Sequence, residues 1–335
     1  MTSLPCPAPL PFGPPRGALA VLGVVLTTLG CSPSKSPGDN AVDWGDSGAS
    51  DDDQQYGPYD DPNELQIGTF NIEWLTVDPL FETRRNDVDH EMIRRLIVEH
   101  GLDVMVLQEV EGEGGMAHLD LPSRWSWTYG STGWSQNLVV LWRNDLVELV
   151  DVRELNLRST TGASKQPIVA RMRHLQGELD FTLVGVHSKP FTDDDDARYR
   201  FTQVAELADW IEGELPDTFE GEFAKNVAIA GDFNDTFEGL NQGWKSLDLI
   251  EQQLGYTFAT RTSTSYSQVS YESLIDHIAL SPGLVDRWTE ADQEDGAHII
   301  AHDLESPWSD YEGGYRDQQN ISDHRPVWLY LSTSP

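Results

Sequence analysis

The chain has 335 residues, of which 39% are apolar and 10% aromatic, so it can form one large domain or two ordinary ones. Its formal net charge of −34 argues against a broad basic surface that binds DNA or RNA by neutralising phosphates. A divalent cation at one site could still reverse the local field and permit cleavage of such a polymer.

The first 31 residues are expected to direct export rather than to fold. The apolar stretch Gly17–Gly30 follows Arg16 and is short for a membrane span, but it has the length of a signal-peptide core. It ends at Cys31 in a Thr-Leu-Gly-Cys sequence that resembles the bacterial lipoprotein cleavage box. We therefore expect lipidation of Cys31, which would tether the chain to a membrane. Cleavage nearby by the ordinary signal peptidase, with a secreted product, stays open.

Residues 32–63 are rich in Ser, Gly, Pro and Asp and are predicted to be a disordered acidic linker. The globular domain is then expected to be 64–335. Its sequence contains no cysteine, so a disulfide framework is excluded and stability has to come from the core.

From residue 64 onward, short β-type apolar runs alternate with a few amphipathic stretches. Helices are predicted around Val88–Ile97, ending at Gly101, and over Asp195–Glu214. The predicted strands are 65–74, 104–107, 137–142, 147–155, 168–172, 181–186, 227–230, 275–280 and 327–331. Sheets packed face to face, with helices outside, would bury such strands on both faces.

Polar residues stand at or just after the ends of three predicted strands, and strand ends are where α/β folds place their sites. They are Asn71, Glu73, Glu109, Asp232 and Asn234. A fourth segment, Ser322–Pro326, adds His324. Several oxygen ligands with one histidine suit a hard cation and a phosphate ester.

Six segments, taken together and in order, resemble the endonuclease/exonuclease/phosphatase superfamily, which has the deoxyribonuclease-I-like fold. They are Thr69–Glu73, Leu107–Val110, Gly185–Ser188, Gly231–Asp235, Ile275–Ile278 and Ser322–Pro326. The resemblance covers 65–332. It implies a four-layer α/β sandwich, in which two packed and mostly antiparallel β-sheets are flanked by helices.

The resemblance also implies a metal site. Glu109 would be the principal Mg²⁺ ligand, with Asn71 and Asp323 beside it and Glu73 assisting through water. Mn²⁺ and Ca²⁺ remain alternatives to Mg²⁺.

The catalytic roles are implied in the same way. His324 would be the general base, with its tautomer fixed by Asp276. Asp232 and Asn234, whose side chains point to one side of an extended backbone, would hold the attacking water and a phosphoryl oxygen. His187 would contact the phosphate or the leaving group.

One position departs from the family's pattern. Nucleases of this fold often pair the second histidine with a Glu, whereas Gln136 stands at the nearest equivalent position, so charge stabilisation of His187 is not expected. His277 and the pair Arg200 and Gln203 are interpreted as structural.

The sequence therefore predicts an exported, monomeric, metal-dependent phosphodiesterase, with nucleic acid as the leading substrate. A phospholipase C or sphingomyelinase acting on phospholipid headgroups is the alternative, with Trp125–Trp127 as its candidate membrane-inserting segment. A catalytically silent surface-binding module is the rival from another class. Its mark would be lost ligands, and here they are intact.

Overall fold

The computed structural model describes residues 63–76, 85–158, 165–240, 243–288, 296–302 and 321–334. All of them belong to the unit Ala49–Pro335. The expected signal segment, the acidic linker and Cys31 lie outside the described residues, so these interpretations stay predictions. Within the described ranges, no helix combines the length and apolar character that crossing a membrane requires.

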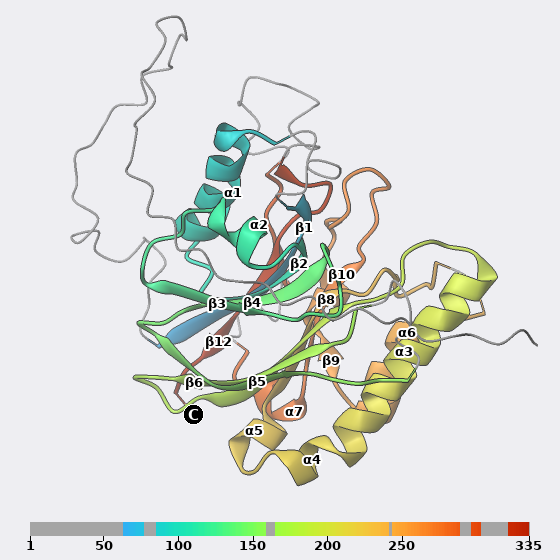
Figure 1. The fold of residues 1–335 in the computed structure, drawn as a ribbon. Coiled ribbons are helices and arrows are strands. Elements are labelled where there is room, and N and C mark those ends of the chain that lie inside the picture. The colour runs from blue at the N-terminus through green and yellow to red at the C-terminus, as the bar shows by residue number, and fades with distance from the viewer. Residues whose placement is uncertain are drawn as a thin grey trace, which may run out of the picture. The chain divides into compact units, whose positions relative to one another are not determined.

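The strands form two six-stranded sheets, which face each other in Figure 1. In chain order, the strands of sheet A are β1 (Glu64–Leu75), β2 (Val104–Val110), β3 (Trp125–Tyr129), β4 (Asn137–Arg143), β11 (His298–Ile299) and β12 (Val327–Ser332). Those of sheet B are β5 (Val147–Glu154), β6 (Ile168–His174), β7 (Asp180–His187), β8 (Val227–Asp232), β9 (Thr257–Phe258) and β10 (Asp276–Leu280).

The spatial order is β11-β12-β1-β2-β4-β3 in sheet A and β5-β6-β7-β8-β10-β9 in sheet B. Each sheet has one parallel pair, β1–β2 and β7–β8, and its other pairs are antiparallel. The prediction of mostly antiparallel sheets is confirmed. Because parallel neighbours end at the same edge of a sheet, each parallel pair delivers two polar strand ends to one place.

Helices cover the outer face of each sheet, which confirms the predicted four-layer sandwich (Figure 1). At sheet A they are α1 (Asp87–Glu99) and α2 (Glu113–Ala117). At sheet B they are α3 (Asp194–Gly213), α4 (Leu215–Thr218), α5 (Glu222–Lys225) and α6 (Ser246–Leu254). The 3₁₀ helix η1 (Ala259–Thr262) and the short helix α7 (Pro282–Val285) complete the described helices.

The two long helices begin at side-chain caps. Asn86 accepts the first free backbone N–H groups of α1, and the carboxylate of Asp89 accepts the N–H of Asn86 at 2.7 Å. Asp193 caps α3 in the same way, and the acidic residues Asp194–Asp196 of its first turn face the positive end of the helix dipole.

The apolar residues divide into three layers because side chains alternate along the central strands. On β2, Val104 and Val106 face the layer between the two sheets, whereas Met105 and Leu107 face the layer under α1. Strand β8 divides in the same way between the central layer and the layer under α3. Burial on both faces explains why these strands read as continuous apolar runs.

The regular pairing of sheet A breaks where the site begins. The register between β1 and β2 shifts between Asn71 and Leu75, and the register between β2 and β4 shifts between Leu107 and Val110. Within these bulges Glu73 has φ 51° and Glu109 has φ 62°, both in the left-handed region. Bulges of this kind re-aim a side chain, and here they turn two predicted site residues away from the regular pleat.

Sheet B needs a glycine at the corresponding place. Gly231 has φ +156°, and a Cβ at this position would lie 2.0 Å from the carbonyl oxygen of Val186 on the parallel neighbour β7. Only glycine therefore permits this close approach of β7 and β8.

All predicted strands and both predicted helices are present, with ends that differ by a few residues. The short elements α2, β3, α4, α5, α6, β9, η1, α7 and β11 were not predicted from the sequence. The interpretation of Trp125–Trp127 as a membrane-inserting segment is wrong. The segment is β3, which pairs with β4, and Trp125 is buried against sheet A with 6% exposed.

Candidate active site

Three strand ends in sheet B align His187, Asp232 and Asp276. His187 lies opposite Asp232 across the β7–β8 pair, and Asp232 lies opposite Asp276 across the β8–β10 pair. Their exposed fractions are 5%, 1% and 0%, respectively. The register of the sheet thus brings together three side chains that are spread over ninety positions of the sequence.

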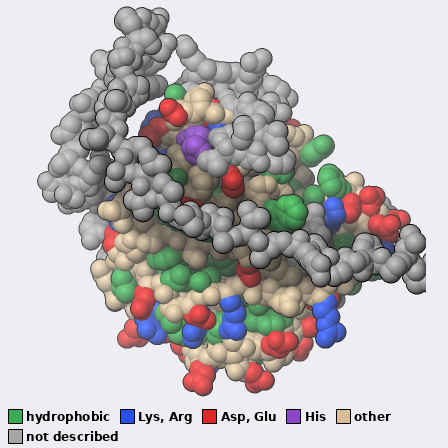
Figure 2. Space-filling model, in the orientation of Figure 1, with side chains coloured by type: hydrophobic (Ala, Val, Ile, Leu, Met, Phe, Trp, Pro, Cys, Tyr) green, Lys and Arg blue, Asp and Glu red, His purple; other side chains and the backbone are tan. Residues whose placement is uncertain are grey.

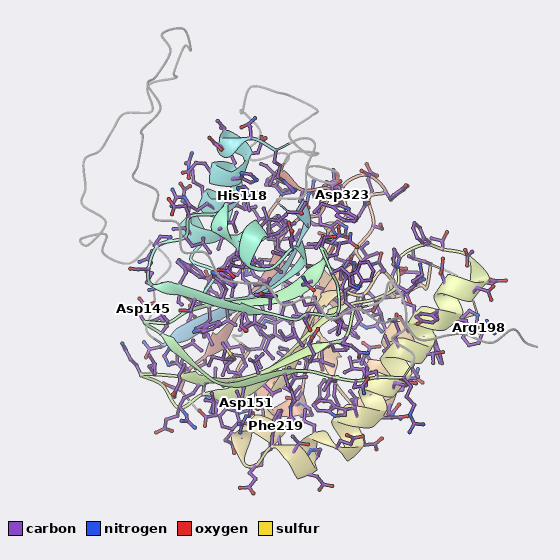
Figure 3. All side chains as sticks on the ribbon, in the orientation of Figure 1. His118, Asp145, Asp151, Arg198, Phe219 and Asp323 are labelled. Carbon is purple, nitrogen blue, oxygen red and sulfur yellow. The ribbon has the colours of Figure 1, made fainter. Side chains whose placement is uncertain are left out.

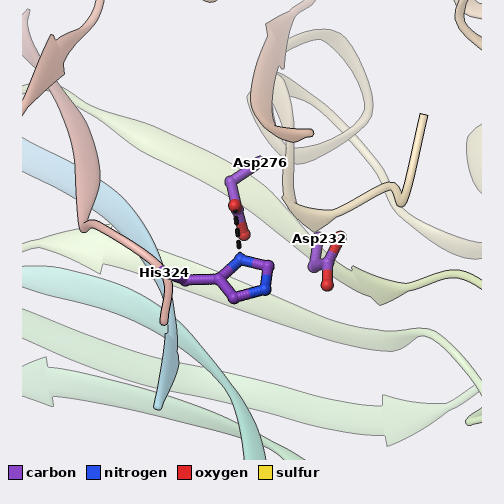
Figure 4. A group of neighbouring side chains, drawn as sticks. All are labelled: Asp232, Asp276 and His324. Atoms are coloured by element: carbon purple, nitrogen blue, oxygen red, sulfur yellow. Dashed lines mark hydrogen bonds and ion pairs between the residues drawn. The ribbon is translucent and has the colours of Figure 1, made fainter. Parts of the chain in front are cut away.

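His324 reaches this row from the segment before β12 of sheet A. Its Nδ1 lies 2.7 Å from Oδ2 of Asp276, so the structure pairs the two residues that the resemblance had linked. Figure 4 shows this hydrogen bond, with Asp232 beside the imidazole ring. Because Asp276 holds Nδ1, Nε2 is the ring nitrogen that stays available to a substrate or a water molecule.

The two histidines of the site titrate in opposite directions. Burial lowers the pKa of His324, but the charge and hydrogen bond of Asp276, helped by neighbouring carboxylates, outweigh burial and hold that pKa well above 6.5. Burial lowers the pKa of His187 well below 6.5, and the positive charge of Lys165 lowers it further. The surroundings of His324 therefore favour the charged ring, and those of His187 favour the neutral one.

Asp232 is a carboxyl group that resists ionisation. Burial, followed by the negative charge of Asp276, raises its pKa to about 7. Hydrogen bonds from Asn71 and from the backbone of Asn234 oppose this rise. The carboxylates of the site therefore carry more negative charge than its cationic side chains and hydrogen-bond donors neutralise.

Asn71 joins the two sheets at the site. Its Nδ2 lies 3.1 Å from Oδ2 of Asp232 and 3.4 Å from Oε1 of Glu109, while its Oδ1 accepts the backbone N–H of the half-buried Glu73. The Nε2 atom of His187 lies 3.6 Å and 3.7 Å from the same two carboxylate oxygens. Carboxylates from two different sheets thus face one shared space.

Gln136 has partners that the sequence did not suggest. Its Nε2 donates to Oε2 of Glu109 at 3.0 Å, and its Oε1 accepts from Nζ of Lys165 at 3.0 Å. It is therefore not bonded to His187, whose Nδ1 has no hydrogen-bond partner among the described residues.

Lys165 is one of the site residues that sequence reasoning missed. It precedes β6 and is 8% exposed; burial lowers its pKa, although the charges of Glu109 and Asp232 oppose this effect. A single lysine before a strand carries no signal in the sequence. Only the structure reveals that its ammonium group points into a carboxylate-rich site.

Asp323 and Gln268 form one side of the site. Oδ1 of Asp323 lies 3.8 Å from Nε2 of His324, and its Oδ2 lies 3.4 Å from Nε2 of Gln268. Figure 3 shows Asp323 at the opposite end of sheet A from Asp145, which lies in the turn after β4. Asp323 is less buried than the row in sheet B, so this side is the more open one.

Asn234 lies just beyond the end of β8 with φ 50°. Its backbone N–H donates to Oδ1 of Asp232 at 2.8 Å, and its Nδ2 donates to the carbonyl of Ser188 at 3.1 Å. The strained backbone is thus held by bonds to β8 and to the loop after β7.

Two further residues, Arg85 and Ser322, tie β1 to the segment that carries His324, and neither was predicted to have this role. The guanidinium of Arg85 donates to carbonyl oxygens of the β1 bulge and, at 2.8 Å, to that of Ile321. Oγ of Ser322 donates to the carbonyl of Asn71 at 2.6 Å and accepts the N–H of His324 at 2.9 Å. These bonds fix the segment that carries His324 to the β1 bulge.

His277, Arg200 and Gln203, which were interpreted as structural, bond neighbouring loops and backbone groups. His277 bonds Oγ1 of Thr260 at 2.8 Å and the carbonyl of Asp235 at 3.0 Å, and burial lowers its pKa to about 4. Arg200 and Gln203 bond backbone groups of the loop that follows β7.

The donor set fits a hard divalent cation. The carboxylates of Glu109, Asp232 and Asp323 are oxygen donors, which Mg²⁺, Mn²⁺ and Ca²⁺ prefer. The amide of Asn71 turns its Nδ2 toward two of these carboxylates and its Oδ1 toward the N–H of Glu73, so it does not offer an oxygen ligand here. Ligand atoms of Asp232, Asp276 and His324 also lie within 4.8 Å of one another. Asp276 and His324 already bond each other through Oδ2 and Nδ1, and both oxygens of Asp232 accept hydrogen bonds.

Comparison with known proteins gives one family. Over residues 68–324 the chain matches a family model described as the Endonuclease/Exonuclease/phosphatase family. A search of curated proteins gives no match.

Several solved structures have a similar fold at low sequence identity. An endonuclease/exonuclease/phosphatase from Bacteroides vulgatus has a TM-score of 0.57 at 16% identity, over 80% of this chain and 98% of that one. The 3′-5′ exonuclease NExo from Neisseria meningitidis has a TM-score of 0.55 at 17% identity, over 80% and 100%. A humanized D. rerio TDP2 has a TM-score of 0.57 at 14% identity, over 81% and 99%.

Proposed function

Because the chain belongs to the endonuclease/exonuclease/phosphatase family, we propose that it hydrolyses phosphodiesters with the help of a divalent cation, and that nucleic acid is its leading substrate. One observation carries the proposal. The paired Asp276 and His324 lie beside the space that Glu109 and Asp232 share, so a base and a carboxylate-rich cation site serve the same phosphate.

In this mechanism His324 takes the proton of the attacking water at Nε2. Asp276 keeps the other ring proton on Nδ1 and stabilises the imidazolium that forms. The charges of Asp232 and Asp323 contribute to the high pKa of His324 in the metal-free site. Neutralising these carboxylates would therefore lower that pKa toward the range in which imidazole acts as a base.

Glu109, Asp232 and Asp323 would hold the cation, and Asn71 would position two of these carboxylates. When bound, it would supply positive charge that stabilises the phosphoryl and leaving oxygens. The ammonium of Lys165, held by Gln136 next to Glu109, would add a fixed positive charge on the same side.

His187 has a different role from His324. Because its pKa is lowered well below 6.5, its ring is neutral, and its Nε2 is directed at the oxygens of Glu109 and Asp232. We assign it to orienting these carboxylates and the phosphate, rather than to delivering a proton as a charged acid.

The test uses the purified protein with plasmid DNA, RNA, sphingomyelin and a bis-aryl phosphate, with Mg²⁺, Mn²⁺ or Ca²⁺ and with chelator. Glu109→Ala and His324→Ala should each lower turnover by at least about 10²–10⁴-fold while the fold is kept. Glu148→Ala is the matched control, since it removes an exposed strand carboxylate that lies outside the site. Chelator-resistant activity with normal turnover in both site variants would refute the proposal.

We also propose export of the chain and lipidation of Cys31. Only the sequence of residues 1–31 supports this, through its apolar stretch and the cysteine that follows it.

A further inference from the structure

Large apolar side chains that are exposed are few among the described residues, and three aromatic ones stand on loops that emerge from the site. Trp134, Phe191 and Tyr271 are 87%, 67% and 83% exposed. Single exposed aromatic residues are ordinary on a protein surface, so exposure alone has no meaning. The significance lies in how each loop is built.

The Trp134 loop is tied to the metal side of the site. Asn137 binds both ends of the turn, because its Nδ2 donates to the carbonyl of Trp134 at 2.6 Å and its Oδ1 accepts the N–H of Gly133 at 3.0 Å. Gln136, two residues after Trp134, donates to Glu109. Trp134 has φ 60°, a conformation that costs a non-glycine residue free energy.

The Phe191 loop is built in the same manner. Nη1 of the buried Arg200 donates to the carbonyl oxygens of Lys189 and Phe191 at 2.9 Å and 2.7 Å, and Gln203 accepts the N–H of Lys189 at 3.0 Å. Phe191 has φ 80° and follows Ser188, whose carbonyl accepts from Asn234. A buried arginine is thus used to hold an exposed phenylalanine in a strained conformation beside a catalytic residue.

Tyr271 lies at the tip of a third loop. Its N–H donates to Oε1 of Gln268 at 2.7 Å, and Gln268 is bridged to His324 at the base of the loop. The side-chain amide of Gln268 lies 3.4 Å from Asp323. All three aromatic residues are therefore connected to catalytic or metal-site residues through a few hydrogen bonds.

A small recess lies next to Lys165 and His187. Its volume of about 20 Å³ gives room for about one water molecule. Its apolar lining consists of Leu157, Pro167, Val186, Val204 and Leu207. Gln203, which holds the Phe191 loop, also lines it.

The net negative charge of the protein limits how its surface can attract a nucleic acid. On the face shown in Figure 2, Lys and Arg side chains lie among Asp and Glu side chains. With a net charge of −34, affinity for a polyanion cannot come mainly from phosphate neutralisation. Stacking of aromatic side chains on bases is an alternative that needs no charge, and it is open only to unpaired bases.

We infer that Trp134, Phe191 and Tyr271 form a stacking rim that binds the unpaired bases of single-stranded nucleic acid next to the scissile phosphate. This inference rests on the proposed function and names the substrate class for the same site. A membrane surface is the other partner that exposed aromatic residues can serve.

The test compares two single-stranded oligonucleotides of equal length. One carries all its bases, and the other has abasic tetrahydrofuran units at the nucleotides that flank the scissile phosphate, so charge is equal and only stacking differs. The wild-type protein should cleave the first with a kcat/KM that is about 5- to 150-fold higher, which corresponds to one stacked base. A duplex of the same sequence should be cleaved more slowly than the single strand.

Trp134→Leu and Phe191→Leu keep an apolar side chain but remove the ring, so each should reduce the ratio between the two oligonucleotides, whereas Trp134→Phe should keep it. Leu175→Ala is the control, because Leu175 is 51% exposed at the turn between β6 and β7, away from the site. The ratio is taken within one preparation, so partial misfolding of a variant cancels.

Three outcomes would overturn the inference. The first is equal cleavage of both oligonucleotides by the wild type, and the second is an unchanged ratio in both leucine variants. The third is loss of binding to sphingomyelin or phosphatidylcholine vesicles in these variants with no change on oligonucleotides, which would assign the rim to a membrane. If no nucleic acid is cleaved but metal-dependent hydrolysis of methyl 4-nitrophenyl phosphate persists, the inference fails and the proposed hydrolase activity stands.

Discussion

Replacing Asp276 with Asn tests the pair at the centre of the site. The bond between Asp276 and His324 is 2.7 Å long, and the two side chains are 0% and 6% exposed, so water and salt screen it little. A hydrogen bond to a charged group is worth about 1.5–3 kcal/mol. Losing the charge of Asp276 should therefore lower the pKa of His324.

The sign of the stability effect follows from the direction of the shift. The pKa of His324 in the folded, metal-free protein is raised above its unfolded value of about 6.5. Its stabilising contribution is therefore fully present below pH 6.5, and it is lost as the pH rises through the folded pKa. Asp276→Asn should cost most stability in the acid range, and the difference from wild type should shrink in alkali.

Three measurements check this prediction. NMR titration of the imidazole gives the pKa, denaturant unfolding at several pH values gives the stability difference, and kcat/KM gives the loss of activity, expected at about 10²–10⁴-fold. Adding Asp276→Asn to His324→Ala should cost little more, because the two residues act as one unit. Fully additive losses, or an unchanged pKa of His324, would refute the pairing.

Three further variants test other parts of the molecule. Gly231→Ala places a Cβ 2.0 Å from the carbonyl oxygen of Val186. Denaturant unfolding should therefore show a loss of more than about 3 kcal/mol, and activity should fall. Unaltered stability would contradict the required close approach of β7 and β8. Arg143→Ala removes the ion pair between Arg143 and the buried Asp103 and should cost about 3–5 kcal/mol in unfolding free energy. The folded fraction should keep normal specific activity. Loss of activity without loss of stability would contradict a structural role for Arg143. Cys31→Ser should convert a detergent-phase product into an aqueous or unprocessed one, and a wild-type protein already found in the aqueous phase would show that lipidation does not occur.

The fold was predictable because its signals are local. Each central strand is a short apolar run buried on both faces, and Asn71 and Asp232 stand where such runs end. The long helices also have an amphipathic pattern that can be read without knowing their partners. Short elements such as α2 and β3 lack such a pattern because their pairing and packing partners determine them.

The site was predictable only in part, because its contacts depend on long-range pairing. Register shifts in β1 and β2 orient Glu109, and no local feature of the sequence indicates them. Gln136 bonds Glu109 and Lys165 rather than His187, since the loops that bring these residues together are set by the sheets. Side chains that act through such pairings, Arg85 among them, could not have been found from motifs.

The bond between Ser322 and Asn71 joins residues that are 251 positions apart, and it holds the backbone of His324. We therefore expect His324, the proposed base, to meet Asp276 only after β12 has closed against β1. Closing so long a loop is costly and slow, and local contacts cannot substitute for it. Recovery of activity during refolding should thus be a late event, after most secondary structure has returned. We expect a folding intermediate of this protein to be compact, to contain most of the side chains proposed to bind the cation, and to be inactive in hydrolysis.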